Sequence, residues 1–102
     1  LKPAILGGWQ ETLKWIKSAK STGILPVLSS SFESGVSHLW IALLASSYVS
    51  EAPAVGLDTA FWFEKDLLKP SFASQIQNGR LILPQKWPEF FELNLNVLQV
   101  PP

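Results

Sequence analysis

Three short segments of this sequence carry residues that can bind or polarise an anionic ligand. They are Lys2, the serines at 29–31 and Gly56. A lysine ammonium can stabilise negative charge that develops in a reaction, and serine hydroxyls and backbone N–H groups can bind a carboxylate. Glycine lets backbone approach a ligand closely because it lacks a Cβ atom. Residues of these types could together form a site for an anion.

Each of these residues also has an ordinary structural interpretation. A lysine is most often a solvated surface residue, three serines suit a polar loop after a strand, and a single glycine is typical of a plain turn. The functional interpretation therefore depends on whether the chain brings the three segments together.

The elements between these segments alternate. Lys2 precedes a proline, which favours extended geometry and the end of a strand, and apolar residues at helical spacing follow it. Alternation of short apolar strands and helices predicts βα units on a parallel sheet, and hence the α/β class. The expected elements are a helix at 9–21 that ends near Gly23, a strand at 24–29, a helix at 35–49, a strand at 55–59 and one or two helical turns at 61–68.

The C-terminal third differs from this alternation. Asn78-Gly79 lies between Ile76 and Leu81, which predicts a β-hairpin within residues 75–83. The segment 87–102 is rich in proline and aromatic residues and carries no motif that we can name.

Composition limits the classes of partner. The 102 residues are 47% hydrophobic and 16% charged, with zero net charge and a pI near 6.8. This balance argues against disorder, gives no reason to expect a nucleic-acid or membrane partner, and indicates surface that is buried against other protein. No cysteine is present, which excludes disulfides and thiolate metal sites, and the lack of any methionine leads us to expect sequence before Leu1.

Three motifs in order resemble a known enzyme family. Leu-Lys-Pro at 1–3, Ser-Ser-Ser-Phe-Glu-Ser at 29–34 and Gly-Leu-Asp-Thr at 56–59 resemble the last third of the o-succinylbenzoate synthases, members of the enolase superfamily. The stretch at 61–68 and the Asn-Gly hairpin are similar to the cyanobacterial or plant-type branch. The resemblance covers about residues 1–83.

The resemblance implies a fold and a role for each site residue. Residues 1–68 would be the C-terminal β/α units, about strands six to eight, of an incomplete (β/α)8 TIM barrel, and 69–102 a tail that returns to an α+β capping domain. Lys2 would be a catalytic cation that stabilises the enolate intermediate. Ser29, through its side chain, with Ser30, Ser31 and Gly56, would bind the succinyl carboxylate of the substrate.

The implied reaction is the Mg²⁺-dependent dehydration of a cyclohexadiene carboxylate to o-succinylbenzoate, in menaquinone or phylloquinone biosynthesis. We expect the metal ligands and the proton-abstracting lysine upstream of Leu1, and structural roles for the acids Glu33 (anchoring its loop) and Asp58 (capping a turn). The remaining barrel and capping domain would be the protein partner, so the 102 residues alone are expected to be inactive. The implied compartment is the cytoplasm, or the plastid in a plant or alga.

Two alternatives stay open. One is another enolase-superfamily enzyme, such as an N-acylamino acid racemase or dipeptide epimerase; the other is a non-catalytic module that binds a partner through aromatic surface. The turn 34–38 looks two residues shorter than in the family, which could displace the next helix. His38 is expected to be a packed or capping residue.

Overall fold

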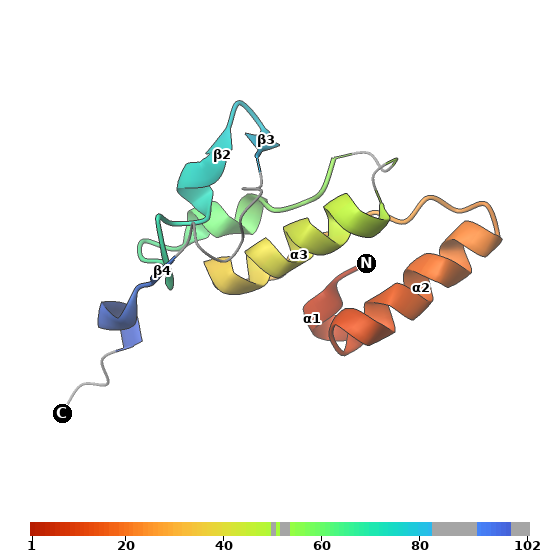
Figure 1. Cartoon of the computed structure of the whole chain (residues 1–102), viewed down its shortest axis with the longest axis horizontal. Coiled ribbons are helices and arrows are strands. Elements are labelled where there is room, and N and C mark those ends of the chain that lie inside the picture. The colour runs from red at the N-terminus through yellow and green to blue at the C-terminus, as the bar shows by residue number, and fades with distance from the viewer. Residues whose placement is uncertain (50, 52–53, 83–91, 99–102) are drawn as a thin grey trace.

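The computed structural model describes residues 1–49, 51, 54–82 and 92–98. Two longer helices lie side by side, and shorter elements follow along the far side of the second (Figure 1). The helices of the described residues are α1 (Pro3–Leu6), α2 (Trp9–Ser21) and α3 (Gly35–Tyr48), with 3₁₀ turns at Asp58–Trp62, Ala73–Gln75 and Leu95–Leu98. The strands are β1 (Leu68–Lys69), β2 (Ile76–Gln77), β3 (Arg80–Leu81) and β4 (Glu92–Leu93).

The two predicted helices are confirmed. α2 spans the expected residues and is followed by Gly23, whose positive φ of 73° is accessible to glycine without strain. Trp9 of α2 packs edge-to-face on Trp40 of α3, with ring centroids 5.8 Å apart. This contact and the apolar core beside it hold the two helices together.

The N-terminus of α3 is capped by a residue distant in sequence. The two Asp66 carboxylate oxygens accept the backbone N–H groups of Gly35, at 2.8 Å, and of Phe72, at 2.7 Å. A carboxylate at this end of a helix satisfies an unpaired N–H group and interacts favourably with the helix dipole. Asp66 therefore ties the start of α3 to the segment after β1.

Three extended segments lie in parallel beside the helices. Leu1 donates to the carbonyl of Val27, at 2.6 Å, and accepts the N–H of Ser29, at 2.9 Å. On the other side, Ser29 and Gly56 form a parallel bridge. The described residues thus combine helices, parallel extended segments and two antiparallel strand pairs, which is compatible with the α/β class, and they do not themselves close a barrel.

The tail agrees with the prediction in one part and differs in another. The hairpin is confirmed, with β2 and β3 paired through Ile76 and Leu81 and positive φ at both Asn78 and Gly79. The predicted helical turns at 61–68 are wrong, because the 3₁₀ turn runs from 58 to 62 and also shortens the predicted strand at 55–59. Asp66 instead lies where it caps α3, and β1 pairs antiparallel with β4. Part of the predicted tail, at 83–91 and 99–102, lies outside the described residues.

Candidate functional site

The backbone pairing places Lys2, Ser29 and Gly56 in one row across the three segments. Leu1 lies opposite Leu28, because it bonds to the residues on both sides of Leu28. Lys2 therefore lies beside Ser29, and Ser29 is bridged to Gly56. Residues in one row of a parallel sheet face the same side. The sequence prediction that these residues converge agrees with this geometry, while their chemical roles remain predictions.

Lys2 lies at the end of its segment with its side chain toward the neighbouring one. Its backbone is extended, with φ −115° and ψ 98°, and α1 begins at the following residue. The Lys2 ammonium donates a hydrogen bond to the carbonyl oxygen of Ser30 at 2.5 Å, and the residue is exposed. An ammonium has three donors, so two remain for an anion.

The three serines at 29–31, which we call the serine turn, are in different environments. Ser30 is 3% exposed, and its hydroxyl contacts the Gly56 carbonyl and the Thr59 hydroxyl. The Ser29 hydroxyl has no hydrogen-bond partner among the described residues, and the Ser31 hydroxyl is buried without one. The Ser29 hydroxyl is thus free for a ligand, the Ser31 hydroxyl is unpaired but buried, and the Ser30 hydroxyl is already bonded within the protein.

The backbone N–H groups of the serine turn are also used by the protein. Ser29 donates to Leu1, Ser30 to the Gly56 carbonyl at 2.8 Å, and Ser31 to the Glu33 carboxylate at 2.6 Å. A carboxylate ligand would therefore be met by hydroxyls and by Lys2 more readily than by these N–H groups. The Glu33 contact confirms the prediction that this acid anchors its loop.

Gly56 has a steric reason to be glycine. A Cβ atom at this position would lie 3.0 Å from the Ser29 Cβ atom. Contact at this distance would push the Ser29 side chain or separate the two paired segments. Gly56 therefore preserves the position of Ser29 as well as leaving the row open.

A partly buried polar network lies behind the serine turn, and its central residue, Thr59, was not predicted from the sequence. His38 is fully buried on α3, as expected of a packed residue, and its Nε2 lies 3.1 Å from the Thr59 hydroxyl oxygen. Thr59 in turn donates to the carbonyl oxygen of Ser31. The only available signal was that Thr59 closes the Gly-Leu-Asp-Thr motif.

The acidic residues do not form a metal centre in the described part of the chain. No group of three or more His, Cys, Asp or Glu side chains among the described residues could hold a metal ion. The carboxylate of Asp58 makes no hydrogen bond to another described residue, so the prediction that it caps a turn is wrong. Its position beside the row leaves it exposed.

The face that bears the row is open and partly apolar. Leu25 and Val27 alternate with the buried Pro26 and Leu28, and they are 49% and 38% exposed, respectively. Alternate residues of an extended segment face opposite sides. One side of the segments is therefore covered by helices, and the other is free to contact a ligand or further protein.

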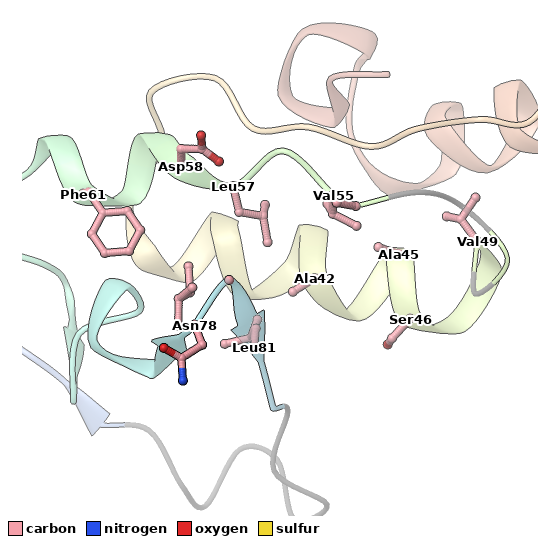
Figure 2. Close-up of a pocket in the computed structure, with 13 residues that line it drawn as sticks. Ala42, Ala45, Ser46, Val49, Val55, Leu57, Asp58, Phe61, Asn78 and Leu81 are labelled. Carbon is pink, nitrogen blue, oxygen red and sulfur yellow. The ribbon is translucent and has the colours of Figure 1, made fainter.

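A separate cavity of about 620 Å³ lies on the other side of α3. Figure 2 shows its walls: Ala42, Ala45 and Ser46 on α3 face Asn78 and Leu81 of the hairpin, with Phe61 and Asp58 at one end. The lining is mainly apolar and carries one carboxylate. This cavity contains neither Lys2 nor any residue of the serine turn.

Comparison with known proteins found one informative relative. Over 70 residues the chain is 34% identical to o-succinylbenzoate synthase of Pasteurella multocida (strain Pm70), a match that covers 69% of this chain and 20% of that enzyme. The matched part thus spans about a fifth of the length of the relative. No family model and no solved structure matches the chain. The similarity supports the predicted relationship to this enzyme family, a family of lyases.

Within the described ranges, no helix is both long enough and apolar enough to cross a bilayer.

Proposed function

We propose that this chain supplies the catalytic cation and the carboxylate-binding rim of an o-succinylbenzoate synthase. In this proposal it forms the C-terminal β/α units of a (β/α)8 barrel of the cyanobacterial or plant-type branch, and the tail returns to the capping domain. The substrate is 2-succinyl-6-hydroxy-2,4-cyclohexadiene-1-carboxylate, which loses water to give o-succinylbenzoate. The remaining barrel strands and the capping domain are the partners.

One observation carries the proposal: Lys2, Ser29 and Gly56 share a row on the open face of parallel segments. Barrel enzymes gather their chemistry at the carboxyl ends of parallel strands. The identity to the Pasteurella enzyme supports the same assignment. The apolar side chains of Leu25 and Val27 beside the row suit contact with further barrel residues.

The chemistry of the row fits an anionic substrate. In this proposal the Lys2 ammonium, held by the Ser30 carbonyl, is the cation that stabilises the enolate. The unpaired Ser29 hydroxyl donates to the succinyl carboxylate, and the buried Ser31 hydroxyl could join it only after a local movement of the turn. Magnesium would supply Lewis-acid stabilisation of the enolate. The described residues do not fit a magnesium site, and in this proposal its ligands come from other strands of the full barrel.

A chimeric enzyme tests the proposal. The 70-residue matched segment of the Pasteurella enzyme would be replaced by that of this chain, extended to include Lys2, and o-succinylbenzoate formation measured with Mg²⁺. We expect turnover, and Lys2→Ala should lower kcat by about 10²–10³-fold, the usual effect of removing a group that stabilises developing negative charge. Lys14→Ala, at an exposed lysine on α2, is the matched control.

The outcomes separate the candidate functions. A folded chimera in which Lys2→Ala and Lys14→Ala are equally active would overturn the role of Lys2. Activity on N-acylamino acids or dipeptides, without dehydration, would favour a racemase or epimerase of the same superfamily. The chain alone is expected to show no turnover.

A second candidate is a module that binds a protein partner without catalysis. The exposed aromatic pair Phe32 and Trp62, with ring centroids 5.8 Å apart, favours it. The chimera distinguishes this candidate from the enzyme, because a segment that only binds a partner would not supply the catalytic lysine and the chimera would not form o-succinylbenzoate.

A further inference from the structure

We propose that His38 and Thr59 are positioning residues that hold the serine turn from the side covered by α3. The relevance of this role to catalysis rests on the proposed function above. The contact of His38 and Thr59 with the serine turn is a property of the chain and can be measured without substrate.

The Thr59 hydroxyl is the centre of the network. Its oxygen lies 2.7 Å from the Ser30 hydroxyl and 3.1 Å from His38 Nε2, and it donates to the Ser31 carbonyl. Two of its three partners therefore belong to the serine turn. One side chain thus contacts consecutive residues of the segment that carries Ser29.

His38 fixes Thr59 from the helix side. Its Nδ1 lies 3.0 Å from the carbonyl of Ser34, and because a carbonyl only accepts, Nδ1 must carry a proton. With one proton on the ring, Nε2 is an acceptor, so Nε2 and the Ser31 carbonyl both face the single proton of the Thr59 hydroxyl. The ring also packs on Phe72, with centroids 5.2 Å apart, and is fully buried. These contacts restrict ring rotation, so Nε2 remains directed at the Thr59 hydroxyl.

The network extends to the candidate catalytic groups. The Ser30 carbonyl accepts the Lys2 ammonium, while the Ser30 hydroxyl contacts Thr59. Ser30 therefore connects the buried network to Lys2, and its neighbour Ser29 is the residue bridged to Gly56. A displacement of Ser30 would therefore move both the Lys2 ammonium and the neighbouring Ser29.

Loss of the Thr59 hydroxyl should remove the hydrogen bonds that fix Ser30 and Ser31 of the serine turn. In Thr59→Val the shape is kept, but buried hydroxyl and ring nitrogen atoms lose a partner, which is costly in a buried site. In Thr59→Ser the hydroxyl returns without the methyl group. The control is Thr12→Val, because Thr12 is also a threonine whose hydroxyl donates to a carbonyl, that of Gly8, far from the serine turn. Thr12 is fully buried whereas Thr59 is half-buried, so this control removes at least as much buried polar contact.

The experiment is ¹⁵N NMR of the 102-residue chain and its variants without ligand. We expect Thr59→Val to shift the Ser30 and Ser31 amide resonances and the His38 ring nitrogens, and Thr59→Ser to restore them. Thr12→Val should leave all of them unchanged. Ser30→Ala, which removes the contact from the turn's side, should also move the His38 ring resonances.

Unchanged Ser30 and Ser31 amides in Thr59→Val would overturn the proposal, as would a lack of rescue by Thr59→Ser. If Thr59→Val does not fold, Ser30→Ala decides instead, and unchanged His38 ring resonances in that variant would overturn the proposal. Titration with o-succinylbenzoate adds a functional measure, with binding expected to weaken roughly tenfold in Thr59→Val, the scale of one lost buried hydrogen bond. Failure of the parent chain to bind o-succinylbenzoate would count against the proposed function alone. The resonances measured without ligand would still test whether Thr59 positions the serine turn.

Discussion

The two faces of the parallel segments use similar residues for different purposes. On the face covered by helices, Leu28, Ser30 and Leu57 are buried, and the Ser30 hydroxyl is bonded within the protein. On the open face, Lys2 is exposed and the Ser29 hydroxyl has no partner among the described residues. Residue type alone therefore does not separate the serine that is bonded within the protein from the one that is open to a ligand, whereas alternation along the strand does.

The largest contrast in stability should be between neighbouring apolar residues. Leu28→Ala removes a fully buried side chain and is expected to lower the free energy of unfolding by about 2–5 kcal/mol. Val27→Ala, on the open face, should cost much less because its side chain already contacts solvent. Chemical denaturation of both variants measures this, and equal costs would contradict the assignment of the faces.

The cap of α3 should give the next largest effect. Gly35→Ala would place a Cβ atom 2.1 Å from an Asp66 carboxylate oxygen, so the carboxylate must move. The N–H groups of Gly35 and Phe72 would then lose their acceptor, at a cost of about 1–3 kcal/mol for a group left unsatisfied. Thermal unfolding followed by far-UV circular dichroism measures this loss of stability. Gly8→Ala is not a suitable control, because Gly8 has positive φ and an alanine there would itself be strained. An unchanged midpoint would show that Asp66 is not an essential cap.

The smallest contrast in stability concerns the serines themselves. Ser30→Ala is expected to cost about 1 kcal/mol, the typical net value of a buried hydrogen bond. Ser29→Ala should change stability by less than about 0.5 kcal/mol, as is usual for a surface substitution, yet weaken carboxylate binding. Paired denaturation and ligand-titration curves measure both quantities. The reverse order of stability losses would exchange the roles that we assign to these two serines.

Local patterns predicted the elements that depend on local chemistry. The helices at 9–21 and 35–48 follow from apolar spacing, and the hairpin follows from Asn78-Gly79, whose residues accept positive φ. The row of Lys2, Ser29 and Gly56 was anticipated through the resemblance to a family, with its roles still to be tested.

Contacts between distant residues could not be predicted in this way. Asp66 caps a helix that begins 31 residues earlier, and it does so from a segment that is not helical, although the spacing at 61–68 favoured helical turns. The pair of His38 and Thr59 is 21 residues apart. Neither leaves a periodic pattern in the sequence, because each depends on how segments pack in space.

A titration of the ¹⁵N-labelled chain with o-succinylbenzoate, followed by NMR, tests whether the row of Lys2, Ser29 and Gly56 binds the substrate's carboxylate. We expect saturable shifts at Lys2, the serine turn and Gly56, and these shifts should be lost in Lys2→Ala. Saturable shifts confined instead to the cavity between α3 and the hairpin, or no saturable shift at the row, would contradict the claim that this open face binds the substrate's carboxylate.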